Sequence, residues 1–276
     1  MTTSTAADRR IAFGFDHEDG LPVWTFGPGE ELVPGLLARH RLGVGTRCET
    51  WLAWSRSLWA PAVVKLARPH QLDHPRARRA LQREVDALSG VLHPCLPRLY
   101  AADLDADRPH VVLEHVDGPA LADLLRPWTF RGVTATVHLT QQLLSALLPL
   151  HAAGVAHLDL KPDNVVVRDG RAVVVDLGSA RKIGSRQPAG RPVGTLGYAA
   201  PEMEACAPIA AAMDVYGVGM VAAEVRGACG SRLPGPRSRR LAGVLADLRA
   251  PEPGDRPGVA EALDALDELL PRRARP

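Results

Sequence analysis

Short segments of alternating apolar and polar residues come first along this chain. Apolar residues recur every three or four positions in only one early segment, 76–92, which predicts an amphipathic helix. The runs expected to form strands are 37–42, 50–55, 61–66, 97–103 and 110–116. Several strands and one helix within about 80 residues predict a small, β-rich first lobe.

The second half of the chain has helical spacing instead. Residues 134–153 carry apolar side chains on one helical face and are followed by a glycine, which is typical of a helix end. Two apolar runs, 164–167 and 171–176, are joined by Asp169-Gly170, and an Asp-Gly pair between such runs indicates a hairpin. Helices are expected over the rest. The prediction is therefore an α+β fold in two lobes, the second mostly helical.

These changes of pattern divide the chain into four regions. They are an irregular N-terminal extension at 1–34, the first lobe at 35–116, the second lobe at 117–270 and a basic tail at 271–276.

One apolar stretch, 205–225, has about the length of a membrane span but carries Asp214 at its centre. Because a carboxylate within a bilayer is costly, a helix buried in the second lobe is favoured and no span is expected.

Composition narrows the classes of partner. Lys and Arg total 33 against 31 acidic residues, and this net charge of +2 argues against nucleic acid or an anionic membrane. The four cysteines form no C-x-x-C pair, so neither a disulfide framework nor a zinc site is indicated. The first ten residues lack the apolar run of a secretory signal, and a cytoplasmic location is expected. The basic residues comprise 30 Arg and three Lys, which indicates a GC-rich bacterial genome.

The segment HLDLKPDN at 157–164 carries the strongest chemical signal. It holds the single Asn of the sequence, Asn164, and one of the three lysines, Lys161. Asp176 follows at the end of the predicted hairpin. One carboxylate and one amide oxygen, completed by phosphate, form a ligand set that suits Mg²⁺. The alternative is a surface loop rich in polar turn residues.

Two further residues are unusual for their surroundings. Lys65 lies in the apolar run AVVKLA, and Glu84 lies within the apolar stripe of the predicted helix 76–92. A buried charge needs a partner of opposite sign. A pairing of Lys65 with Glu84 would satisfy both.

Taken in order, these motifs resemble those of bacterial, eukaryotic-like serine/threonine protein kinases over roughly residues 37–270. The main motifs are Gly43-Val44-Gly45, Lys65, Glu84, HLDLKPDN, Asp176-Leu177-Gly178 and Ala200-Pro201-Glu202. Three more pieces of that pattern are Gly194-Thr195, Asp214-Val215-Tyr216-Gly217 and Asp255-Arg256-Pro257. A single G-x-G motif is weak support, whereas nine motifs in order are specific.

The resemblance implies ATP and Mg²⁺ as cofactors and assigns a role to each motif. The residues that would bind ATP are Gly43, Val44, Gly45, Thr50, Val63, Lys65, Leu113, Glu114 and Val116. Asn164 and Asp176 would hold the metal. The catalytic set would be Asp159 as proton acceptor, Lys161 for the phosphoryl charge, Thr195 in contact with both, and the Lys65–Glu84 pair. Arg256 would pair with Glu202 to hold the activation segment.

The chain also departs from the family pattern. Cys48 replaces the third glycine of the loop, and Leu177 replaces the phenylalanine of D-F-G. Leu158 replaces the arginine of H-R-D, and this removes the cation that would bind a phosphorylated activation segment. The resemblance nevertheless implies an enzyme that transfers the γ-phosphoryl group of ATP to Ser or Thr hydroxyls of a protein substrate.

Two other functions stay open at this point. A nucleotide-binding pseudokinase scaffold is favoured by Cys48 and Leu158. It is opposed by four intact residues, Lys65, Asp159, Asn164 and Asp176. A small-molecule kinase would share the H-x-D-x-x-x-x-N loop, but such enzymes generally lack the segment from Gly194-Thr195 to Ala-Pro-Glu. The sequence also leaves a homodimer open.

Overall fold

A computed structural model describes residues 13–15, 20–126, 132–187, 190, 192–229 and 235–271. It divides into two compact units, the first with residues 1–82 and 99–115 and the second with residues 83–98 and 116–276. The chain passes from the first unit to the second after residue 115, one residue before the expected boundary. Residues 83–98, expected in the first lobe, belong to the second unit. Of the expected basic tail only Pro271 is among the described residues.

An antiparallel six-stranded sheet in the order β3-β4-β5-β6-β8-β7 makes up most of the first unit. Its strands are β3 (Glu31–Val33), β4 (Leu36–Val44), β5 (Cys48–Ser55), β6 (Ala60–Ala67), β7 (Leu99–Asp103) and β8 (His110–Glu114). The five predicted strands are confirmed as β4 to β8. Burial alternates strictly along β5, as expected of a strand with one face on the core.

The expectation that residues 1–34 are irregular is wrong in part. Strand β1 (Phe13–Phe15) pairs with β2 (Pro22–Trp24), and β3 extends the edge of the main sheet. Residues 1–12 and 16–19 lie outside the described part of the chain. Strands of three residues are too short to show a period in the sequence. Burial of the side chains of β2 and β3 in the core, and not local alternation, stabilises these two strands.

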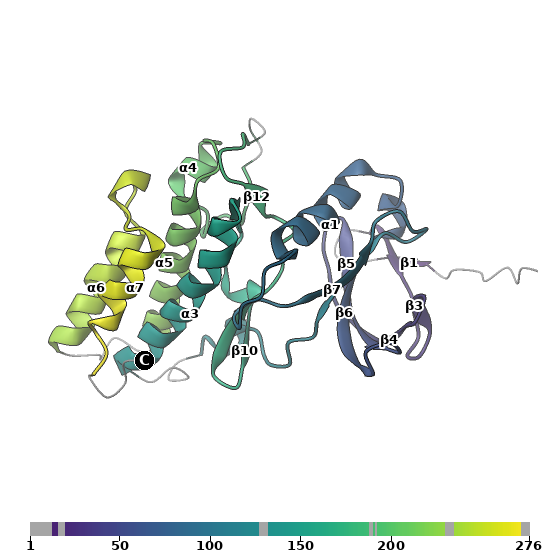
Figure 1. The fold of residues 1–276 in the computed structure, drawn as a ribbon, viewed down its shortest axis with the longest axis horizontal. Helices are drawn as coiled ribbons and strands as arrows, with labels where there is room; N and C mark the ends of the chain where they lie inside the picture. The colour runs from purple at the N-terminus through teal and green to yellow at the C-terminus, as the bar shows by residue number, and fades with distance from the viewer. Residues whose placement is uncertain are drawn as a thin grey trace, which may run out of the picture. The chain divides into compact units, whose positions relative to one another are not determined.

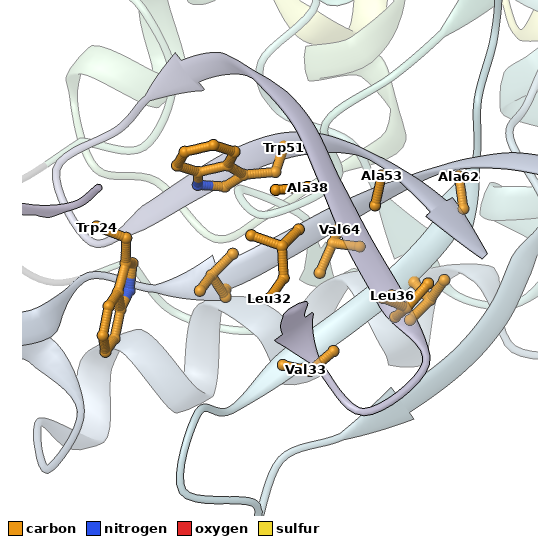
Figure 2. Packing of buried hydrophobic residues seen from close by; sticks show 11 residues of the cluster. Trp24, Leu32, Val33, Leu36, Ala38, Trp51, Ala53, Ala62 and Val64 are labelled. Atoms are coloured by element: carbon orange, nitrogen blue, oxygen red, sulfur yellow. The ribbon is translucent and has the colours of Figure 1, made fainter. Parts of the chain in front are cut away.

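The core of the first unit lies on one face of this sheet (Figure 2). Trp24 and Leu32, from the N-terminal strands, are at most 1% exposed and pack with Trp51 and Val64. Phe26 stacks on Trp24 with ring centroids 5.6 Å apart. The N-terminal segment is therefore an integral part of the core.

Helix α1 (Pro75–Leu88) follows a 3₁₀ turn, η1 (Pro69–Gln71), and ends earlier than the predicted residue 92. Gly90 takes a left-handed φ of 74°, which stops the helix. The chain beyond the helix bonds to the second unit, because the Val174 amide donates to the Cys95 carbonyl at 2.9 Å. This hydrogen bond is one of the contacts that join 83–98 to that unit.

The second unit is mostly helical. Its helices are α2 (Leu121–Leu124), α3 (Gly132–Ala152), α4 (Pro201–Glu204), α5 (Ala211–Ala228), α6 (Pro236–Leu248) and α7 (Val259–Asp267). The four longest pack side by side (Figure 1). Helix α5 is buried along much of its length, which confirms the prediction for the apolar stretch around Asp214. Among the described residues, none of the helices has both the length and the apolarity that crossing a membrane requires.

The predicted hairpin is confirmed as β10 (Val165–Arg168) paired with β11 (Arg171–Val174). Asp169 and Gly170 have φ values of 50° and 78°, the signs that a two-residue type I′ turn requires. A second short pair joins β9 (Val155–Ala156) to β12 (Arg181–Lys182). Two 3₁₀ turns, η2 (Pro162–Asn164) and η3 (Pro253–Asp255), complete the unit.

Candidate functional site

The predicted site residues divide between the two units. The first unit holds Gly43, Val44, Gly45, Thr50, Val63, Lys65, Leu113 and Glu114. The second holds Glu84, Val116, Asp159, Lys161, Asn164, Asp176 and Thr195. The pairing of Lys65 with Glu84 joins residues of different units and stays a prediction.

Strand register brings the first set together. Gly43 is the partner of Thr50, and Thr50 is the partner of Lys65, so the three lie in one row across β4, β5 and β6. Val63 is in the same way the partner of Leu113 in β8. Lys65 is only 9% exposed. The sheet thus places glycine backbone, a hydroxyl and a buried cation in line.

The turn between β4 and β5 is the candidate phosphate-binding loop. Its ends are joined by a hydrogen bond from the Gly45 amide to the Cys48 carbonyl at 2.8 Å. A side-chain carbon added at Gly43 would meet nothing within 4 Å, and one added at Gly45 would meet the Cys48 carbonyl oxygen at 3.3 Å. Gly43 therefore leaves open space beside an exposed backbone, which is what close approach of a ligand needs.

The second set is centred on the carboxylate of Asp159. Its Oδ1 accepts a hydrogen bond from the Thr195 hydroxyl at 2.6 Å, and its Oδ2 accepts one from Asn164 Nδ2 at 3.1 Å. Asn164 Nδ2 also donates to the Asp159 carbonyl at 2.8 Å. The predicted contact of Thr195 with Asp159 is present, whereas the hydrogen bonds of the described residues include none between Thr195 and Lys161. Both oxygens of the carboxylate have fixed directions.

Asp214 of α5 holds the loop that carries Asp159. This carboxylate is 1% exposed and accepts the backbone amides of His157 and Leu158, each at 2.8 Å. His151 Nε2 lies 2.8 Å from Asp214 Oδ2. Because a buried carboxylate is costly without donors, these contacts fix the loop firmly. They also support Leu158 in a left-handed conformation with φ of 69°, which few non-glycine residues adopt.

Asn164 and Asp176 form a donor set that fits Mg²⁺. The side-chain hydrogen bonds of Asn164 to described residues are made by Nδ2, which leaves the amide oxygen for a cation. Asp176 is exposed and adds a carboxylate next to Gly178, whose amide donates to Asp176 Oδ1 at 3.1 Å. Within the described residues, no three His, Cys, Asp or Glu side chains gather in a metal-binding group. One carboxylate and one amide suit a metal that takes its other ligands from phosphate and water.

Glu84 lies beside the Asp176 segment. This helix residue is 1% exposed, and its Oε1 accepts the backbone amide of Leu177 at 3.2 Å. Leu177, which replaces the usual phenylalanine, is fully buried. The buried leucine and the carboxylate together hold the segment that carries Asp176.

The segment from Gly194 to Glu202 is held at two points. Tyr198 donates its hydroxyl to Glu224 Oε2 at 2.7 Å, and burial together with this carboxylate raises the pKa of Tyr198. Arg256 binds Glu202 through two bonds, at 2.6 and 2.8 Å, which confirms the predicted pair. Leu196 next to Thr195 is 83% exposed. The segment is therefore held near its middle and at its last residue, and it carries an exposed apolar side chain beside the site.

Leu158 packs against this same segment. It is 4% exposed and belongs to an apolar cluster with Ala156, Ala200, Met203, Ile209 and Met213. A side-chain carbon added at Gly194 would lie 2.6 Å from the Leu158 carbonyl oxygen. Leu158 therefore makes apolar contacts at the position where the kinase family has an arginine.

Sequence reasoning missed two buried charged residues in the first unit, Glu49 and Arg68, both 0% exposed. Glu49 alternates with Trp51 and Ala53 on the buried face of β5. That alternation was a usable signal in the sequence. The partners of both residues could not be derived, because they depend on how β2 and the β4–β5 turn are placed in the fold.

Comparison with known proteins agrees with this geometry. The family described as protein kinase domain matches residues 37–231. Serine/threonine-protein kinase Pkn1 of Myxococcus xanthus is 30% identical over 236 residues, which cover 82% of this chain and 33% of the relative. Serine/threonine-protein kinase pkn2 of the same organism is 33% identical over 228 residues, covering 78% of this chain and 27% of the relative. The chain thus spans between about a quarter and a third of the length of these curated relatives.

The fold agrees with a solved structure. The kinase domain of Mycobacterium tuberculosis PknI, in a form with one cysteine changed to alanine, has a TM-score of 0.68 to this chain at 24% identity. The match covers 89% of this chain and 99% of that one. The prediction of an α+β fold with a β-rich first part and a helical second part is confirmed.

Proposed function

Because this chain belongs to the protein kinase family, we propose that it transfers the γ-phosphoryl group of ATP to a Ser or Thr hydroxyl of a protein substrate. The observation that carries the proposal is the carboxylate of Asp159. It accepts the aliphatic hydroxyl of Thr195 at 2.6 Å, which is the kind of group that a substrate Ser or Thr would present. The names of the relatives, serine/threonine-protein kinases, support the same acceptor class.

In the proposed reaction the substrate oxygen bonds to the γ-phosphorus while the bond from that phosphorus to the bridging oxygen of ADP breaks. The hydroxyl proton passes to Asp159, whose orientation is set by Thr195 and Asn164. The side chain of Lys161 makes no hydrogen bond or ion pair with the described residues, so its ammonium is available for the charge of the transferred group.

We assign nucleotide binding to the predicted residues of the first unit and to Val116, the first residue of the second unit after β8. The backbone of Gly43 and Gly45 would approach the phosphates, Lys65 would bind phosphate oxygens, and Glu114 with Val116 would offer backbone groups to the base. Asn164 and Asp176 would hold Mg²⁺, which neutralises phosphate charge when bound. A bacterial source, a cytoplasmic location and a homodimer stay predictions of the sequence.

The proposal is tested by incubating the purified protein with γ-labelled ATP, Mg²⁺ and a generic basic protein. We expect label on Ser and Thr of that protein after acid hydrolysis, and none when Mg²⁺ is replaced by EDTA. Binding of ATP without any label transfer would instead indicate the scaffold function.

Gly43→Ala should weaken ATP binding without lowering stability. The new methyl group meets nothing within 4 Å in the protein itself, so the melting temperature should not fall. In a loop that the phosphates approach, however, it takes up ligand space, and we expect Kd to rise by about tenfold, or ~1.4 kcal/mol. The control is Gly227→Ala, at an equally open position in α5. Equal affinities for Gly43→Ala and the wild type would contradict the loop assignment.

Activity should not depend on phosphorylation of the activation segment. With Leu158 buried in an apolar cluster, the catalytic loop has no arginine there to receive a phosphate. Phosphatase-treated protein and Ser185→Ala should therefore stay within a few-fold of the untreated rate, below about 1.4 kcal/mol in barrier height. A tenfold loss of activity that rephosphorylation restores would show that a cation other than the missing arginine binds the phosphate. Arg191 of this segment lies outside the described residues.

A further inference from the structure

Arg68, just after β6, ties two separate segments together. Its side chain is 0% exposed and donates to three backbone carbonyls, namely Leu21 at 3.1 Å, Pro22 at 3.3 Å and Gly45 at 3.2 Å. The Arg68 amide also donates to the Arg47 carbonyl at 2.9 Å. One residue thus binds the N-terminal segment and the turn between β4 and β5. We call residues 21–24 together with Arg68 the N-terminal clamp.

A second buried charge reinforces this connection. Glu49, the residue after that turn, accepts the Trp24 amide at 2.8 Å and the Trp51 indole N–H at 3.1 Å. Arg41 lies 3.7 Å from the same carboxylate. Burial raises the pKa of Glu49, while these hydrogen bonds and the charges of Arg41 and Arg68 oppose the rise. The clamp is therefore fixed by charged groups at both ends.

Trp24 anchors the clamp in the core. Its indole N–H donates to the Ala67 carbonyl at 2.8 Å, and its ring lies against the buried residues of the sheet (Figure 2). Residues 21–24 precede the 37–231 region that matches the kinase family. Residues 21–24 of the clamp therefore lie before the matched region, and Arg68 inside that region joins them to the turn between β4 and β5.

From this geometry we infer that the N-terminal clamp positions the turn from Gly45 to Cys48 for nucleotide and so sets the affinity for ATP. The inference rests on the proposed function, because it takes that turn as the phosphate-binding loop. A glycine-containing turn loses conformational entropy when it closes on a ligand, and a turn that is already held loses less. Arg68 acts through the turn and not on the reacting atoms, so it is a positioning residue.

Arg68→Lys is the direct test. Lysine keeps the charge but has no planar fork, so it cannot bond to three carbonyls in these directions. We expect Kd for a non-hydrolysable ATP analogue with Mg²⁺ to rise at least fivefold (~1 kcal/mol). At saturating ATP, kcat should stay within about twofold, because the reacting groups are unchanged. An unchanged Kd would overturn the inference, as would a fall in kcat alone.

Arg108→Lys supplies the matched control. Arg108 binds the same N-terminal extension, through the carbonyls of Glu31 and Leu32, and its guanidinium lies 5.0 Å from the Trp24 ring. The variant should lose stability as Arg68→Lys does but keep the wild-type Kd. Equal increases in Kd for both variants would show that the clamp only stabilises the fold, and this result would overturn the inference.

Hydrogen exchange of the Gly45–Cys48 turn separates this inference from the proposed function. The Gly45 amide is bonded to Cys48, and we expect it to exchange faster in Arg68→Lys but not in Arg108→Lys. Nucleotide-free protein suffices for this measurement. If the wild type binds no ATP analogue, the proposed function and the role in affinity both fail, while faster exchange would still support positioning of the turn. Unchanged exchange would refute positioning itself.

A second variant covers the case in which Arg68→Lys does not fold. Glu49→Gln keeps one acceptor oxygen for the Trp24 amide but places an amide donor against the Trp51 indole N–H. It should loosen the same clamp, with the same rise in Kd and the same faster exchange. Wild-type values for both would again overturn the inference.

Discussion

Asp159→Asn should lower phosphoryl transfer by at least about 10²-fold while ATP binding persists. The amide has nearly the shape of the carboxylate, and its oxygen can still accept one of the two bonds now made by Thr195 and Asn164. It cannot take up the hydroxyl proton. Transfer of γ-label to the basic protein measures the rate, and thermal shift with ATP and Mg²⁺ measures binding.

Asp163→Asn provides the control for this variant. Asp163 is an exposed acid in the same loop, so the substitution makes the same change of charge near the site. We expect its rate to stay within a few-fold of the wild type. Equally slow transfer by the wild type and Asp159→Asn, with ATP bound to both, would favour a pseudokinase scaffold.

The sequence predicts secondary structure well where a periodic segment is long or where a turn has a characteristic residue pair. Strands β5 and β6 have eight residues each, enough for alternation to be visible, and the hairpin carries an Asp-Gly pair that suits left-handed φ. Strands β1 to β3 were missed because three residues show no period. Contacts with residues far along the chain stabilise β2 and β3, such as the hydrogen bond from the Trp24 amide to Glu49.

The main residues of the candidate site could be predicted from the sequence, but the contacts that support them could not. Family motifs led to Asp159, Asn164 and Thr195, and the structure joins all three by hydrogen bonds although Thr195 is 36 residues from Asp159. The connection of Arg68 to Leu21 was not predictable, because it spans 47 residues and depends on the position of a segment outside those motifs. Motif order identifies chemistry, whereas the supporting contacts require the fold.

Asp176→Asn should remove most of the Mg²⁺ dependence of ATP binding. Asp176 has a left-handed φ of 63°, a conformation that Asn tolerates better than Ala, so the backbone should be preserved. The variant loses a full negative charge on the proposed metal ligand, and hard divalent cations bind carboxylates far more strongly than amides. We expect phosphoryl transfer to fall by at least about 10²-fold, as on loss of a strong electrostatic group.

ATP titrations with Mg²⁺ and with EDTA distinguish loss of the metal from loss of the fold. The wild type should bind at least about tenfold more tightly with Mg²⁺, or ~1.4 kcal/mol, and Asp176→Asn should bind in both buffers as the wild type does in EDTA. The matched control is Asp169→Asn, an exposed carboxylate with φ of 50° in the hairpin turn, which should behave as the wild type. Asp169→Asn makes the same substitution at a similar backbone conformation. A difference in ATP affinity between the two variants is therefore due to the position at which the negative charge is lost. If both variants keep the Mg²⁺ dependence, or if the wild type shows none and no turnover, Asp176 is not the metal ligand.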